Sequence, residues 1–143
     1  MTRRKYPSRP WVSAHAIIFN AENKILLTKR AAPPKKHYWF PPGGAINLGE
    51  TVKEGLKREI LEETAVKVKN LQFIDYIDGI TRDDNNRIAF HFVVFMFSAD
   101  YLEGDVKAMD DALAVRWLSI EEIKKGNVLI TDELLTLLEK IER

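Results

Sequence analysis

Three glutamates that stand close together have the clearest capacity for chemistry. Glu59, Glu62 and Glu63 fall within the stretch 51–64, whose apolar residues recur at the four-residue spacing of a helix. A helix advances by about 100° per residue, so the three carboxylates point into one sector beside the apolar stripe. Like charges at this spacing destabilise a helix by roughly a few tenths of a kcal/mol per pair, and partial burial adds to that cost. Bound Mg²⁺ or Mn²⁺ would make the arrangement favourable, because these ions prefer oxygen ligands.

A purely structural interpretation of the same glutamates stays open. They could line a water-exposed helix face and pair with the neighbouring cations Lys57, Arg58 and Lys67. The preceding sequence favours a binding site instead. The Pro-Pro-Gly-Gly turn at 41–44 would let a phosphate or a cation approach the backbone closely, and Glu50 adds a further carboxylate.

The stretch 44–66 resembles the sequence signature of the Nudix hydrolases. Its fixed positions occur here at the family's spacing: Gly44, Glu50, Arg58, Glu59, Glu62 and Glu63. The lead-in at 38–44 and the segment 115–118 are also similar to the family. One position departs from the pattern, because Ala65 stands where glycine is usual. Glycine commonly supplies a left-handed helix end, so we expect alanine there to cost about 1–2 kcal/mol or the helix to end differently.

The resemblance implies a metal-dependent hydrolase of nucleoside diphosphates linked to another group, built as an α/β/α sandwich around a mixed β-sheet. Carried over by position, the ligands of Mg²⁺ or Mn²⁺ would be Glu59, Glu62, Glu63 and the carbonyl of Gly43. Glu59 would also help to activate the attacking water. Arg58 would point away from the metal ions and hold Glu50 by ion pairing. Metal ions in such sites neutralise pyrophosphate charge and lower the pKa of water.

Several residues are candidates for contact with the substrate: Gly44, Arg30, Trp39, His37 and Asp111. Trp39 could stack on a nucleobase, and packing in the core is an equally open interpretation. Arg30 could meet a phosphate or lie in a solvated loop. Asp111 could read a purine edge, bind metal or form a polar turn. His15 and His91 are predicted to be structural.

The elements that must position these residues follow from the sequence pattern. Strands are predicted at 11–19, 24–30, 71–81, 88–97 and 112–118. The first two are predicted to form a hairpin, and the fourth, apolar on both faces, a central strand. Helices are predicted at 51–64, after Ser119 and from Thr131 or Asp132 onward. The class is therefore α/β, with α+β character: a mixed sheet with helices packed on its faces.

Composition limits the remaining possibilities. A chain of 143 residues with 45% hydrophobic and 30% charged residues is typical of one folded domain. The net charge of +1 gives no general attraction for nucleic acid or membranes, and the lack of cysteine excludes disulfides and thiol nucleophiles. We expect a flexible basic arm at 1–10, one domain at 11–143 and a cytoplasmic protein.

The leading hypothesis is hydrolysis of a pyrophosphate bond in a small nucleotide. The segment 30–34 before Tyr38-Trp39 is similar to ADP-ribose pyrophosphatases, and a nucleoside triphosphate is nearly as well supported as the substrate. One alternative is a Nudix-fold sensor that binds a nucleotide or an RNA end without cleaving it; the intact glutamates argue against it. An RNA-end pyrophosphohydrolase has only the basic arm in its favour. A homodimer also stays open.

Overall fold

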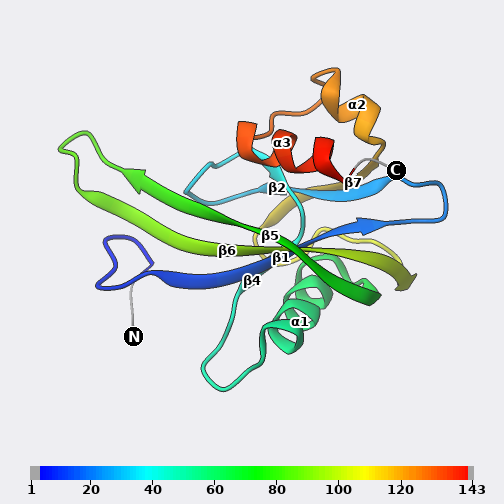
Figure 1. Cartoon of the computed structure of the whole chain (residues 1–143), viewed down its shortest axis with the longest axis horizontal. Coiled ribbons are helices and arrows are strands. Elements are labelled where there is room, and N and C mark those ends of the chain that lie inside the picture. Colours follow the sequence, from blue (N-terminus) through cyan, green and yellow to red (C-terminus); the bar gives the residue numbers. More distant parts are fainter. Residues whose placement is uncertain (1–3, 142–143) are drawn as a thin grey trace.

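A mixed β-sheet with helices on both faces forms the molecule (Figure 1). This computed structural model describes residues 4–141. The sheet order is β3-β2-β1-β6-β5, with β4 paired to β1 and β7 paired to β2. Only β1 and β6 pair in parallel among these strands. The elements are β1 Trp11–Phe19, β2 Ile25–Arg30, β3 Trp39–Phe40, β4 Gly43–Ala45, α1 Val52–Thr64, β5 Lys67–Arg82, β6 Ile88–Glu103, β7 Ala112–Leu118, α2 Ile120–Lys124 and α3 Asp132–Lys140. The expected α/β/α arrangement around a mixed sheet is confirmed.

The alternation of side chains along β1 divides the core between the two faces. Ala14, Ala16 and Ile18 are buried on the face that α1 covers with Leu56 and Ile60. Ile17 and Phe19 of β1 pack on the other face, in a cluster with residues of α2 and α3. Figure 1 shows α1 below the sheet and the two shorter helices above it. No helix in residues 4–141 has both the length and the apolar character required to span a bilayer.

Two predictions about β1 need correction. The expected hairpin with β2 pairs only where Phe19 meets Ile25, because β1 otherwise pairs with β4 and β6. The Pro-Pro-Gly-Gly segment was expected to be a turn, yet Gly43–Ala45 forms the short strand β4, which among the described strands pairs with β1 alone. Glycine makes this possible, since a Cβ at Gly43 would collide with the Ala14 carbonyl oxygen. The hairpin of β5 and β6 is longer than predicted, and β6 is central as expected.

Helix α1 has well-defined ends. At its start the Thr51 hydroxyl accepts from the Glu54 N–H, and the Glu54 side chain accepts from the Thr51 N–H, a capping box. At its end Ala65 adopts the left-handed conformation, with φ 63° and ψ 19°. Ala65 thus takes the geometry that glycine would take more easily, the first of the two expected outcomes.

The segment between β6 and β7 closes the same end of α1. The backbone N–H of Lys107 donates to the Thr64 carbonyl at 3.0 Å, and that of Met109 donates to the Glu63 carbonyl at 2.9 Å. These bonds satisfy helix carbonyls that would otherwise lack partners. They also fix the backbone of Glu63, one of the candidate ligands.

Candidate active site

Glu59 lies directly against the backbone of β4. A Cβ at Gly44 would stand 2.5 Å from Oε2 of Glu59 and 2.6 Å from its carboxyl carbon. Only a glycine therefore leaves room for this carboxylate. Burial raises the pKa of the Glu59 carboxyl, and a hydrogen bond from Arg58 opposes that shift.

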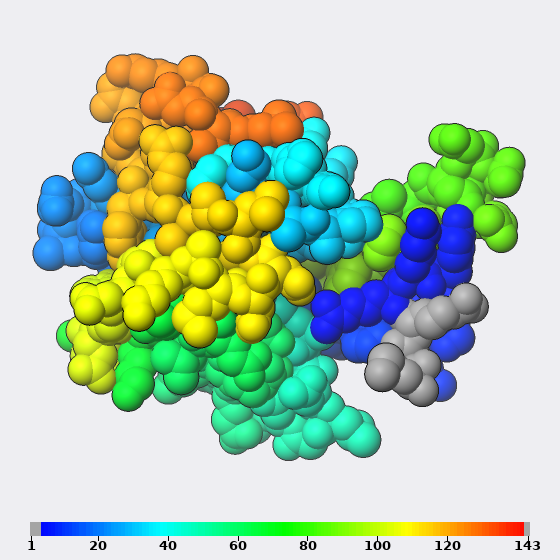
Figure 2. Space-filling view, turned by 180° about the vertical axis from the view of Figure 1, so that it is seen from behind, coloured from blue at the N-terminus to red at the C-terminus, as the bar shows by residue number. Residues whose placement is uncertain are grey.

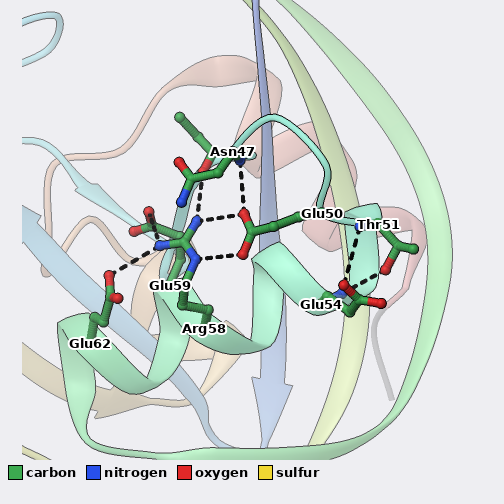
Figure 3. A network of polar contacts seen from close by, with 8 residues as sticks. Asn47, Glu50, Thr51, Glu54, Arg58, Glu59 and Glu62 are labelled. Carbon is green, nitrogen blue, oxygen red and sulfur yellow. Dashed lines mark hydrogen bonds and ion pairs between the residues drawn. The ribbon is translucent and has the colours of Figure 1, made fainter.

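The guanidinium of Arg58 donates two parallel hydrogen bonds to the carboxylate of Glu50 (Figure 3). Nε donates to one carboxylate oxygen at 2.7 Å and Nη2 to the other at 2.9 Å, and Nη2 also donates to the Ala45 carbonyl at 3.1 Å. The Asn47 N–H adds a further bond to Glu50 at 2.8 Å. Arg58, followed by Asn47, holds the pKa of Glu50 below its ordinary value. The predicted ion pair of Arg58 with Glu50 is confirmed, and it fastens the turn before α1 to the helix.

Arg58 also reaches the other acidic residues, which the resemblance did not imply. Its Nη1 donates to Oε1 of Glu59 at 2.9 Å and to Oε2 of Glu62 at 3.1 Å (Figure 3). The expectation that Arg58 points away from the metal ligands is therefore wrong. Arg58 lies one residue before Glu59 and one helical turn before Glu62. Its planar guanidinium therefore contacts Glu50 through Nε and Nη2, and the other two carboxylates through Nη1. Within residues 4–141, no three acidic or histidine side chains converge as a ready set of metal ligands.

Glu63 occupies a very different environment on the same helix. Its carboxylate faces β2, where the buried Thr28 hydroxyl lies 3.4 Å from Oε1, and it accepts a hydrogen bond from the Gly43 N–H. Burial, the largest influence, and the negative charge of Glu59 raise the pKa of Glu63 to about 7, against the opposing effects of the Gly43 bond, the Arg30 charge and the Thr28 hydroxyl. Ionised Glu63 is thus incompletely stabilised by the groups around it.

Arg30, the last residue of β2, lies near both Glu63 and Asp111, and Asp111 belongs to the segment before β7. The Arg30 Nε donates to the Pro34 carbonyl at 2.8 Å. Burial lowers the pKa of the Arg30 guanidinium, and the charges of Glu63 and Asp111 oppose that shift. The carbonyl of Asp111 accepts from the Ala31 N–H at 3.0 Å, which joins the end of β2 to the segment before β7. The structure therefore brings both predicted substrate residues beside the acidic cluster.

The other candidate residues lie elsewhere. Trp39 is 9% exposed and packs in the core beneath α3. His37 is exposed in the loop after β2, where its N–H donates to the Arg30 carbonyl at 2.9 Å. His15 is buried and pairs with the Pro41 carbonyl at 2.8 Å. Burial lowers the pKa of His15 to about 4, so it is neutral and structural, as predicted.

The donor set fits a divalent cation. Glu59, Glu62 and Glu63 offer hard carboxylate oxygens, the ligand type that Mg²⁺ and Mn²⁺ take. Arg58 Nη1 already stands between Glu59 and Glu62 as a positive group bonded to both. The lack of a side chain at Gly44 leaves the space that the Glu59 carboxylate occupies. The assignment of these residues as ligands stays a proposal.

Thr28 is the site residue that the sequence did not reveal. It alternates with Leu26 and Arg30 along β2, so the strand period alone places all three on one face. The sequence does not say which side of the sheet this face lies on. The packing of Leu26 against α1 shows that it is the α1 side. The Arg30 side chain is oriented by the same alternation.

Comparisons with known proteins agree with this geometry. The model of the NUDIX domain matches residues 9–138. The ADP-ribose pyrophosphatase of Methanocaldococcus jannaschii is 34% identical over 116 residues, 81% of this chain and 66% of that protein. The 8-oxo-dGTP diphosphatase of Buchnera aphidicola is 29% identical over 120 residues, 77% of this chain and 94% of that protein. The crystal structure of a MutT NUDIX hydrolase from Burkholderia pseudomallei superposes with a TM-score of 0.76 at 24% identity, covering 94% of this chain and 99% of that chain.

The chain thus spans just under two thirds of the archaeal relative's length. The family model covers nearly all of the sheet and the helices, from before β1 into α3. The predicted resemblance is confirmed, and the chain belongs to the Nudix family.

Proposed function

We propose that the chain is a metal-dependent pyrophosphohydrolase that cleaves the pyrophosphate bond of a nucleoside diphosphate linked to another group. The observation that carries this proposal is the placement of Glu59 and Glu63, two partly buried carboxylates beside the Gly43-Gly44 backbone. Buried carboxylates that no cation fully neutralises are unfavourable unless a positive ligand binds them. A divalent cation with a diphosphate is a ligand of the required charge.

Each residue then has a defined task. Glu59, Glu62 and Glu63 would hold Mg²⁺ or Mn²⁺, which supplies charge neutralisation and an acidified water when bound. Glu59 would accept the proton of the attacking water, since its carboxylate is oriented by the Arg58 Nη1 and the Gly44 backbone. Thr28 and the Gly43 N–H orient Glu63. Gly44 leaves room for the Glu59 carboxylate against the β4 backbone, and Gly43 could add its carbonyl as a ligand.

Two substrate classes have support. The archaeal relative is named an ADP-ribose pyrophosphatase, which favours a nucleotide sugar such as ADP-ribose. The Buchnera relative is named an 8-oxo-dGTP diphosphatase, which favours a nucleoside triphosphate. Arg30 suits either class, because its guanidinium can pair with phosphate oxygens. A homodimeric state and a cytoplasmic location stay predictions.

Turnover of a substrate panel tests the proposal. The purified chain is incubated with ADP-ribose, other nucleotide sugars and nucleoside triphosphates, with Mg²⁺, with Mn²⁺ or with EDTA, and products are identified by mass. We expect cleavage that needs the metal, with AMP and ribose 5-phosphate from ADP-ribose. Glu62→Gln should lower kcat by roughly 10²-fold or more, since it removes a charged ligand.

Glu133→Gln, at an exposed position on α3, is the matched control and should retain wild-type turnover. Wild-type rates for Glu62→Gln would contradict the metal assignment. Nucleotide binding without any turnover would identify the chain as a sensor instead.

A further inference from the structure

The chain at 105–113 leaves β6, crosses the end of α1 and enters β7. The N–H of its Met109 donates to the Glu63 carbonyl at 2.9 Å, and the carbonyl of its Asp111 accepts from the Ala31 N–H at 3.0 Å. In Figure 2 this segment (yellow) lies on the surface beside α1 (green) and the chain that follows β2 (light blue). Backbone hydrogen bonds therefore attach the segment both to the helix that carries the acids and to the end of β2.

The strand register places Leu113 on the face of β7 that belongs to the site. Val115 pairs directly with Thr28, whose hydroxyl lies 3.4 Å from the carboxylate of Glu63. Alternation along the strand puts Leu113 on the same face as Val115, roughly 7 Å further along. The next residue of β2 on this face is Arg30, which pairs with the neighbour of Leu113 in β7. Leu113 therefore lies beside both the buried acid and the arginine.

Two irregularities of the backbone occur at this position. Arg30 pairs with Ala112 where Leu113 would follow in register, so Leu113 is the extra residue of a bulge. Bulges are common beside active sites, because they change the direction of a side chain. Asp110 has a φ of 50°, in the left-handed region that is unfavourable for residues other than glycine. Strained residues of this kind also concentrate at functional sites.

Met109 and Leu113 expose apolar side chains in this segment. They are 41% and 52% exposed. The Ala112 N–H donates to the Met109 carbonyl at 3.0 Å, which closes a turn and keeps Met109 close to the start of β7. The side chains around them that were assigned to the site are polar or charged, among them Thr28 and Arg30. Exposed apolar side chains with a polar surround are typical of a binding surface.

A nucleotide has a matching division of chemistry. Its diphosphate is an anion that suits Arg30 and a cation held by the acids of α1. Its base is a flat aromatic ring with apolar faces, which gains from contact with apolar side chains in proportion to the area covered. Methionine adapts its shape to such a ring, and its sulfur makes favourable contacts with aromatic groups. The base therefore fits Leu113 and Met109 while the phosphates lie at the acids.

We propose that Leu113 and Met109 form the surface on which the nucleobase of the substrate packs, next to the diphosphate. The inference rests on the proposed function, since it assigns the nucleoside part of the substrate to the same site. Neither residue takes part in proton transfer or in metal binding. Both determine the affinity for the nucleoside and leave the affinity for the diphosphate unchanged.

Calorimetric binding of two ligands in the presence of Mg²⁺ tests this division. α,β-Methylene-ADP is a nucleotide that cannot be hydrolysed at its bridged pyrophosphate, and methylenediphosphonate has the same bridged diphosphate without a nucleoside. The Kd of each ligand is determined for wild type, Leu113→Ala, Leu113→Met, Met109→Ala and Leu129→Ala. Leu129 is the matched control, a leucine that is 53% exposed between α2 and α3, on the other face of the sheet.

We expect Leu113→Ala to weaken the Kd for α,β-methylene-ADP roughly 3- to 10-fold, as for the loss of one or two buried methyl groups. The Kd for methylenediphosphonate should stay within about twofold of wild type. Leu113→Met should recover most of the affinity, because it conserves the apolar volume. Met109→Ala should act in the same direction as Leu113→Ala but less, since a flexible side chain loses more freedom on binding.

The same measurements separate this inference from the proposed function. If wild type binds both ligands and Leu113→Ala matches Leu129→Ala, or loses affinity equally for both ligands, the nucleobase surface is wrong and the diphosphate site is unaffected. Equal Kd values of wild type for the two ligands would also overturn it, because the nucleoside then adds nothing. A loss specific to the nucleotide, in a chain that turns over no pyrophosphate, would support the surface and contradict the proposed hydrolysis.

Discussion

Glu50 and Glu63 are carboxylates of the same sequence signature in opposite environments. Glu50 accepts a two-pronged ion pair from Arg58 and a backbone N–H, and its pKa is lowered. Glu63 is half-buried between α1 and β2, without an ion pair, and its pKa is raised to about 7. The protein itself neutralises the charge of Glu50. The ionised Glu63 carboxylate has no ion pair and needs a positive ligand from outside.

This difference separates structural acids from binding acids within one motif. Glu50 fixes the turn that carries the glycines, because Arg58 links it to α1 and to the Ala45 carbonyl. Glu63 is left with only neutral donors, Thr28 and Gly43. Glu59 stands between the two kinds, since Arg58 contacts it while burial raises its pKa. Substitutions at several positions, beginning in the site, test this difference between the carboxylates.

The largest effect is expected from Gly44→Ala. The new methyl group would stand 2.5 Å from Oε2 of Glu59, so the flexible Glu59 side chain must move while the backbone stays in place. We expect kcat to fall by roughly 10²-fold, as for a displacement of about 1 Å in an active site, with little change in Tm.

Gly79→Ala is the matched control, because a Cβ there meets its nearest atom, a carbonyl oxygen, at 3.4 Å. Steady-state kinetics and thermal melts of both variants provide the comparison. Unchanged kcat in Gly44→Ala would show that the position of Glu59 is not critical.

Arg58→Lys tests the ion pair that neutralises Glu50. Lysine keeps the charge but cannot make the parallel bonds to Glu50 or reach the Ala45 carbonyl at the same time. We expect a loss of about 1–3 kcal/mol in the free energy of unfolding, together with a lower kcat. Urea titration measures the first and kinetics the second, with exposed Arg116→Lys as the control. An effect confined to KM would contradict a structural role for Arg58.

The pH dependence of stability tests the environment of Glu63, which has no ion pair. The pKa of Glu63 is about 7 in the folded state against 4.5 as the ordinary value, so the folded protein keeps a proton that the unfolded chain releases. Without metal, stability should therefore fall by about 1–3 kcal/mol as pH rises from about 4.5 through about 7. Glu63→Gln should lack this fall.

The difference between wild type and Glu63→Gln is the quantity to measure, by urea titration in EDTA across that range. His15 titrates in both proteins with the opposite sign, since its lowered pKa of about 4 makes stability fall on acidification, and its contribution cancels in the difference. A difference that does not change with pH would contradict the environment assigned to Glu63.

Ala65→Gly should have the smallest effect and no effect on kcat. Ala65 holds a φ of 63° at the end of α1, and glycine adopts this conformation without the steric cost. We expect a gain of about 1 kcal/mol, which raises Tm by roughly 3 °C in a chain of this length. A melt by circular dichroism is sufficient. A lower Tm would show that contacts of the Ala65 methyl group stabilise the fold by more than its left-handed conformation destabilises it.

The sequence was sufficient for those features that depend on local pattern. Helix spacing placed the three glutamates in one sector, and the strand pattern predicted β1, β2 and β7 close to their observed bounds. It was insufficient where long-range packing decides. The pairing of β1 with β4 and β6 depends on contacts between distant segments, as does the location of Thr28 beside Glu63. The second set of contacts made by Arg58 could not be read from residue types alone.

Titration of the metal-free chain with Mn²⁺ by calorimetry, for wild type, Glu63→Gln and Glu133→Gln, is the most direct measurement. We expect saturable uptake by wild type and by Glu133→Gln, and affinity at least about tenfold weaker in Glu63→Gln, because a carboxylate ligand is lost. Equal affinity in all three proteins, or no uptake in any, would contradict the proposal that the partly buried acids of α1 bind a divalent cation.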